Sequence, residues 1–157
     1  MAVARREWQI DRPVRSGMGE MVLLHHVDGA EEHWDWLLER DVPSGACGFD
    51  RRLIAFRVNE PLDPTRVAEF AATRIGDHRA VYLEYEGPLP APGGSPRAAG
   101  TVQRVWRGSC RVDVEAPTRL ELTVTLDGRI ASFAGEAVDL SDGGGGEGGR
   151  AWWFTRV

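Results

Sequence analysis

Residues 119–134, RLELTVTLDGRIASFA, show how this chain is built. From Leu120 to Leu126 every second residue is apolar and the residues between them are polar, which is the alternation of a strand with one buried face. Asp127-Gly128 follows, and this dipeptide is typical of a two-residue hairpin turn. The stretch therefore predicts an antiparallel hairpin, with strands over residues 119–126 and 129–140.

Short apolar segments between glycine-rich or proline-rich turns continue through the rest of the chain. Their regular spacing predicts a mainly β protein, a small closed or partly open barrel of about eight strands. One short helix is expected over residues 64–73, with Asp63 as its N-cap. Residues 87–100 and 141–149 are expected to be loops. The remaining strands are expected over residues 20–26, 32–40, 52–58, 81–85, 101–106, 109–115 and 151–157.

The composition is that of a folded globular domain: 157 residues, 42% hydrophobic and 27% charged. We expect an N-terminal arm over residues 1–19 and a barrel domain over residues 20–157. No apolar run approaches the ~20 residues of a membrane helix, so a cytoplasmic protein without membrane contact is expected. The net charge of -5 argues against a nonspecific coat on nucleic acid and leaves room for a local basic pocket. Cys47 and Cys110 lack the spacing of a zinc knuckle.

Three of the four histidines lie close together in the sequence. These are His25, His26 and His33, and Asp35 follows two residues after the last. Side chains two residues apart on a strand share a face, so His33 and Asp35 should project together, and a short turn would bring His26 back beside His33. Two imidazoles and a carboxylate can bind a divalent metal with positions left open for a substrate. The alternative is that they are ordinary surface residues of a hairpin.

The fourth histidine, His78, precedes Tyr82 by four residues. In an extended chain the two side chains would share a face. An imidazole and a phenol can both donate hydrogen bonds to a phosphate oxygen. The alternative is a His and a Tyr at a barrel rim with no part in chemistry.

Several segments resemble one family. His33-Trp34-Asp35-Trp36-Leu37-Leu38-Glu39 resembles the His-Tyr-Asp-Leu-Arg-Leu-Glu signature of the 3'-phosphoesterase domain of bacterial ligase D. Residues 78–87 are similar to the family's His-Pro-Leu-x-Tyr-x-x-Phe-Glu-Gly, with the same spacing from His to Tyr. Residues 99–108 resemble its Gly-Ala-Gly-Thr-Val and Val-Trp-Asp-Arg-Gly run, and residues 126–130 and 153–156 fit its last strands. The likeness covers nearly the whole chain, with four motifs in the family's order.

This resemblance implies a small Mn²⁺-dependent β-barrel enzyme, with Zn²⁺ as another possible metal. Its activity would be hydrolysis at 3' ends of DNA, removing a 3'-phosphate or a 3'-ribonucleotide during repair. The implied partners are DNA 3' ends or a primer-template, together with end-joining repair proteins. Matched residue by residue, the implied metal ligands are His26, His33 and Asp35, and the residues that engage the reacting phosphate are His78 and Tyr82.

The chain departs from the family pattern at two places. Leu37 stands where the family has an Arg that faces the same pocket, so a bidentate phosphate donor is missing, and Arg97 could supply a cation instead. The interval from His26 to His33 is one residue longer than in the family, which leaves His25 and His26 as alternative ligands. A second hypothesis is therefore a catalytically weakened or inactive barrel that serves as a nucleic-acid or protein binding module.

Overall fold

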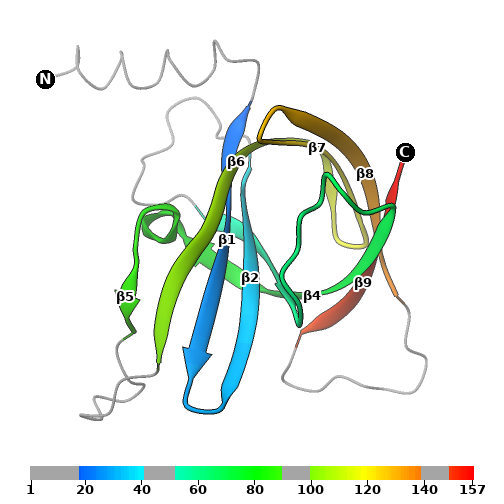
Figure 1. Cartoon of the computed structure of the whole chain (residues 1–157). Coiled ribbons are helices and arrows are strands. Elements are labelled where there is room, and N and C mark those ends of the chain that lie inside the picture. Colours follow the sequence, from blue (N-terminus) through cyan, green and yellow to red (C-terminus); the bar gives the residue numbers. More distant parts are fainter. Residues whose placement is uncertain (1–17, 41–51, 90–99, 139–148) are drawn as a thin grey trace, which may run out of the picture.

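The computed structural model describes residues 18–40, 52–89, 100–138 and 149–157, which form a mainly β fold (Figure 1). The expected N-terminal arm therefore lies almost entirely outside the described residues. No helix within these ranges is long and apolar enough to cross a membrane. The elements in these ranges are β1 (Gly19–Asp28), β2 (Glu31–Glu39), β3 (Arg52–Val58), β4 (Glu69–Arg79), the 3-10 helix η2 (Ala80–Leu83), β5 (Gly87–Pro88), β6 (Thr101–Ala116), β7 (Arg119–Leu126), β8 (Arg129–Ala137) and β9 (Arg150–Arg156).

Eight of these strands close into a ring (Figure 1). They pair in the order β1-β2-β3-β4-β9-β8-β7-β6, every pair is antiparallel, and β1 pairs with β6 to complete the circuit. The short strand β5 lies outside the ring and pairs with the first residues of β6. The predicted mainly β architecture of about eight strands is confirmed.

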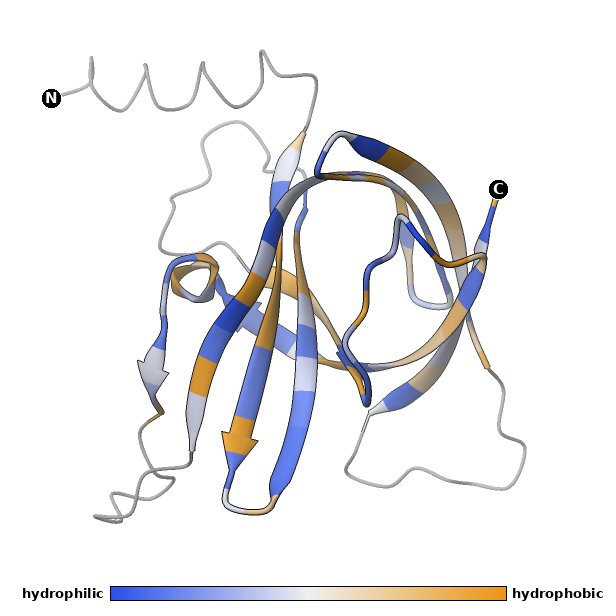
Figure 2. Cartoon of the chain, in the orientation of Figure 1, coloured by the Kyte–Doolittle hydropathy of each residue, from blue (hydrophilic) through white to orange (hydrophobic). Residues whose placement is uncertain are grey.

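The inside of the ring is filled by one apolar cluster. Along β7 the alternation predicted from the sequence holds, because Leu120, Leu122, Val124 and Leu126 are all buried. Bands of opposite hydropathy also alternate along β6 in Figure 2. Aromatic rings form the centre of the cluster, where Phe154 stands 5.0 Å from the ring of Phe56 and 4.9 Å from that of Phe70. Burial of these side chains provides the main driving force for folding.

The prediction of a helix over residues 64–73 is wrong. Only a turn follows Asp63, whose Oδ1 accepts hydrogen bonds from the backbone N (2.9 Å) and the Oγ1 (2.6 Å) of Thr65. Strand β4 then begins at Glu69 and pairs with β3 on one side and β9 on the other. Asp63 and Pro64, which suggested a helix N-cap, thus belong to a turn, because an Asp side chain can accept backbone hydrogen bonds in turns as well as at the start of helices.

Two strand boundaries also differ from expectation. The segment expected as a strand over residues 81–85 instead contains η2, the only helical element among the described residues. The two strands expected over residues 101–106 and 109–115 form one continuous strand, β6. Gly108 does not break β6, because this glycine allows close packing: a Cβ there would lie 2.5 Å from the carbonyl oxygen of Thr125.

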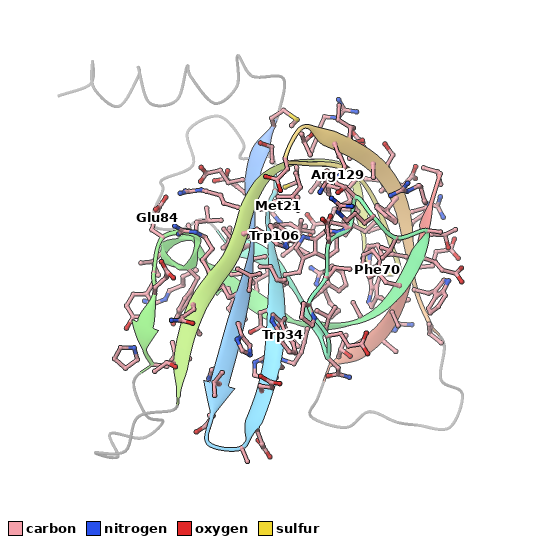
Figure 3. All side chains as sticks on the ribbon, in the orientation of Figure 1. Met21, Trp34, Phe70, Glu84, Trp106 and Arg129 are labelled. Atoms are coloured by element: carbon pink, nitrogen blue, oxygen red, sulfur yellow. The ribbon has the colours of Figure 1, made fainter. Side chains whose placement is uncertain are left out.

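A second apolar cluster covers the outside of the ring. It consists of Val22 and Leu24 from β1, Leu37 from β2, Leu53 and Ala55 from β3, and Leu83 from η2. Polar contacts hold the segment that carries η2 in place. Arg107 of β6 contacts Glu84 and donates to Glu20 at 3.0 Å, and Arg104 Nη1 donates to the Leu83 carbonyl oxygen at 3.4 Å. Glu84 lies outside the ring in Figure 3, beside β6. The segment η2–β5 therefore forms a second layer over β1, β2 and β3.

The packing of Phe154 against Gly135 gives a test of the core. A Cβ at Gly135 would lie 2.5 Å from Phe154 Cε1, so we expect Gly135→Ala to lower the free energy of unfolding by roughly 1–3 kcal/mol. Urea denaturation measures the change. Gly76→Ala is the control, since a Cβ at this position in β4 meets no atom within 4 Å. Equal stability of the two variants would contradict the packing.

Candidate active site

His26 and His33 face each other across the first hairpin, as predicted. They are direct partners in the register of β1 and β2. Their rings meet edge to face with centroids 4.6 Å apart, and His26 Nδ1 lies 3.0 Å from His33 Nε2. The turn between the strands thus brings the two imidazoles into hydrogen-bond contact.

His25 lies on the opposite face of β1. Its ring stacks on Trp34, with centroids 4.5 Å apart and planes 6° from parallel, and its Nε2 lies 2.7 Å from Glu32 Oε2. Neighbouring residues of a strand point to opposite faces, so only one of the two histidines can share a face with His33 and Asp35. Of the two alternatives left open by the sequence, the structure places His26 with these residues.

Asp35 is a buried charged group, with its side chain 9% exposed. His33 Nε2 lies 3.5 Å from Asp35 Oδ2, and Arg57 Nε donates to Oδ1 at 3.0 Å. Burial raises the pKa of Asp35, but the hydrogen bonds from His33 and Arg57 and their positive charges outweigh it, so the pKa lies below its ordinary value. Asp35 is therefore a carboxylate at neutral pH.

Arg57 is a site residue that the sequence reasoning missed. It lies on β3 as the direct partner of Asp35. Alternation along β3 places Arg57 on the outer face with Leu53 and Ala55. In the sequence, the only sign of this site residue was one Arg near the end of a mainly apolar strand. This sign did not place Arg57 beside Asp35, because residues 41–51 between the two strands are long enough to allow several registers between β2 and β3.

His78 and Tyr82 meet as predicted, although not on one extended strand. His78 is near the end of β4, and Tyr82 lies in η2. Their rings are 5.7 Å apart in a T-shaped arrangement. His78 Nδ1 bonds the Gly76 carbonyl oxygen at 3.0 Å, so Nδ1 is the donor, and Nε2 lies 3.8 Å from Asp35 Oδ2.

One cavity brings most of these side chains together. Its volume is about 360 Å³, and it opens between the outer face of the ring and the η2–β5 layer. Arg97 lies outside the described residues. His33 does not line the cavity, but it contacts the lining residues His26 and Asp35. The cavity is lined by Leu24, His26, Asp35, Arg57, Asp77, His78, Arg79, Tyr82, Leu89 and Val102.

The predicted metal ligands contact one another directly. In the described ranges, no group of three or more His, Cys, Asp or Glu side chains is arranged so that it could hold a metal ion. His33 Nε2 instead lies 3.0 Å from His26 Nδ1 and 3.5 Å from Asp35 Oδ2. Ligands that share a divalent ion at bond lengths of about 2.0–2.2 Å lie roughly 2.8–3.6 Å from each other. The donor types therefore suit a divalent cation, but their present arrangement does not form a group that could hold one, so binding would require that the contacts from His33 to His26 and to Asp35 give way.

Leu37 supports the second layer. It is fully buried and packs in the outer cluster with Leu83, beside Tyr82. Position 37 therefore supplies no cation to the cavity. The cations that line the cavity come instead from β3, as Arg57, and from the end of β4, as Arg79.

A network of charges fixes the end of β4 from which His78 projects. Arg40 Nη1 donates to Asp77 Oδ2 at 2.9 Å, while Arg40 Nε and Nη2 donate to the two oxygens of Glu115 at 2.9 and 2.7 Å. The hydrogen bonds from Arg40 to Glu115 are the main cause that raises the pKa of Arg40. A second cavity of about 460 Å³ adjoins this network and includes Asp77 but none of the predicted site residues.

Comparison with known proteins does not extend this description. A scan of protein-family models and a search of curated proteins found no match to the chain. The relation to the phosphoesterase family therefore rests on the sequence motifs and stays a proposal.

The lowered pKa of Asp35 gives a pH test. A carboxylate with a lowered pKa stabilises the folded state above its unfolded pKa, near 3.9, and this contribution is lost as the pH falls through the folded pKa. Asp35→Asn should therefore cost about 1–3 kcal/mol of unfolding free energy at pH 7, and the difference from wild type should shrink below about pH 4.

Urea denaturation from pH 7 to pH 3 measures this difference. The control is Asp113→Asn, because Asp113 is an exposed residue that pairs with Arg111 on the same strand. A difference that is independent of pH, or equal in both variants, would contradict the assignment.

Proposed function

We propose that this protein is a divalent-metal-dependent phosphoesterase, with Mn²⁺ as the preferred metal, which removes a 3'-phosphate or a 3'-ribonucleotide from DNA ends. One observation carries the proposal. Four of the five residues implied by the family resemblance, His26, Asp35, His78 and Tyr82, line one cavity, and the fifth, His33, contacts two of them. These residues come from separate parts of the chain, so motif spacing alone does not account for their meeting.

His26, His33 and Asp35 are the residues that would hold the metal. When bound, the ion would act as a Lewis acid on a phosphoryl oxygen. Each imidazole must offer an unprotonated nitrogen to ligate the ion. If His26 Nδ1 and His33 Nε2 are the ligating atoms, the hydrogen bond that now joins them would have to be given up. Asp35 supplies the one negative charge of the ligand set and is already ionised.

His78 and Tyr82 would engage the phosphate. The bond from His78 Nδ1 to the Gly76 carbonyl fixes the ring so that Nε2 faces the cavity and Asp35. In its protonated form His78 can donate from Nε2 to a phosphoryl oxygen, and the Tyr82 hydroxyl can donate to another. Donors placed where negative charge develops stabilise the transition state.

The second candidate function is a binding module without turnover. The observation in its favour is Leu37, which stands where the family has an Arg, is buried and does not line the cavity. The same cavity would then bind DNA ends without hydrolysing them. The two functions differ in turnover, so one assay that records both binding and product separates them.

The test is incubation of the purified protein with Mn²⁺ and a primer-template ending in a 3'-phosphate or a single 3'-ribonucleotide. We expect removal of the terminal group, and we expect His33→Gln, Asp35→Asn, His78→Gln and Tyr82→Phe each to lower the rate by about 100-fold or more, because each removes a metal ligand or a donor to the phosphate.

His25→Gln is the matched control and should keep the wild-type rate, since His25 lies on the other face of the strand that carries His26. No Mn²⁺-dependent product from either substrate would contradict the enzymatic proposal. Binding of the primer-template without product would support the binding module.

A further inference from the structure

Arg57 occupies an unusual position between the candidate metal site and the cavity. Its guanidinium bonds Asp35 through Nε to Oδ1 at 3.0 Å and through Nη2 to Oδ2 at 3.5 Å. The Arg57 side chain is 41% exposed, whereas that of Asp35 is 9% exposed. Within the described residues, Asp35 is the only acid at ion-pair distance from Arg57. One edge of the guanidinium therefore neutralises a buried carboxylate, and the rest of it is accessible from the cavity.

The contact between Arg57 and Asp35 competes with metal ligation. Both oxygens of Asp35 already have partners, Arg57 on Oδ1 and His33 together with Arg57 on Oδ2. A carboxylate that ligates a divalent cation has less charge to offer a guanidinium, and the cation repels the guanidinium directly. Arg57 would then need a different anion.

A phosphate in the same cavity is the anion that suits Arg57. A guanidinium presents N–H donors in a planar fork that matches two phosphate oxygens, and such bidentate pairs are among the strongest hydrogen bonds in proteins. Arg57 lines the cavity together with His78 and Tyr82, the two candidate phosphate donors. No arginine is available from position 37, which holds the buried Leu37.

We propose that Arg57 is a phosphate-binding residue, and that its ion pair with Asp35 keeps it from binding phosphate until a cation is bound. Without a divalent cation it neutralises Asp35, and once Asp35 ligates the cation it turns to a phosphate oxygen of the substrate. This inference rests on the proposed function, and it adds an order of binding: the cation binds before the phosphate. It also assigns to Arg57 the role of the family's missing Arg.

The test is isothermal titration of the wild type and Arg57→Gln with Mn²⁺, and then with inorganic phosphate in the presence and absence of saturating Mn²⁺. We expect the variant to bind Mn²⁺ about threefold tighter or more, because a competing cation is gone from Asp35. We expect phosphate to bind about tenfold weaker to the Mn²⁺-loaded variant than to the loaded wild type. Without Mn²⁺, the wild type should bind phosphate weakly, because Arg57 is occupied.

Arg79→Gln is the matched control. Arg79 lines the same cavity and carries the same charge, but no ion pair or hydrogen bond joins it to Asp35. Its Mn²⁺ affinity should change much less than that of Arg57→Gln. Arg57→Lys is a second variant should the first not fold. It keeps the charge but not the fork, so phosphate affinity should fall severalfold without loss of Mn²⁺ affinity.

A folded Arg57 variant that binds both Mn²⁺ and phosphate more weakly than the wild type would overturn the inference, since Arg57 would then only hold the metal ligands in place. An unchanged phosphate affinity would overturn it as well. Either result leaves the proposed function standing as long as the wild type binds Mn²⁺ in a way that depends on His33. Absence of such Mn²⁺ binding in the wild type would instead remove the metal site, and both proposals with it.

Discussion

The ion pair between Asp35 and Arg57 is the interaction around which the outer face of this barrel is organised. A carboxylate that is 9% exposed stays charged only when its neighbours replace the water it has lost, and here Arg57 and His33 do so. Three adjacent strands supply the groups: β2 carries the carboxylate and His33, β3 carries the guanidinium, and β1 carries His26. The ordinary pleat of an antiparallel sheet puts all four side chains on one face.

The barrel can place such a site on its outside because it has two apolar layers. The interior of the ring is filled by aromatic and aliphatic side chains. Outside, Leu83 and the segment η2–β5 cover Val22, Leu24 and Leu37, and the contacts from Arg104 and Arg107 hold this cover in place. The cavity lies between this cover and the ring, beside His78 and Tyr82. Burial next to the polar groups lowers the local dielectric and strengthens their interactions.

The sequence predicted the strands wherever alternation or turn chemistry was clear. The bounds over residues 52–58 and 119–126 agree with β3 and β7, and the juxtaposition of His26, His33 and Asp35 follows from the period of a strand and one short turn. The helix after Asp63 was wrong because an Asp side chain caps turns as well as helices, and strand β4 owes its structure to pairing with β3 and β9. Arg57 was missed for a related reason, since its place opposite Asp35 depends on the register of two strands that are joined by a long connection, residues 40–51. Local pattern gives the face of a strand, but long-range pairing decides what lies beside it.

The most direct measurement of the central claim is a crystal structure of the protein with Mn²⁺, with the ion located by its anomalous scattering. We expect a single strong peak in contact with His26, His33 and Asp35, with the Arg57 guanidinium no longer bonded to both oxygens of Asp35. A peak bound elsewhere, or no peak at saturating Mn²⁺ while the hydrogen bond between His26 and His33 persists, would contradict it.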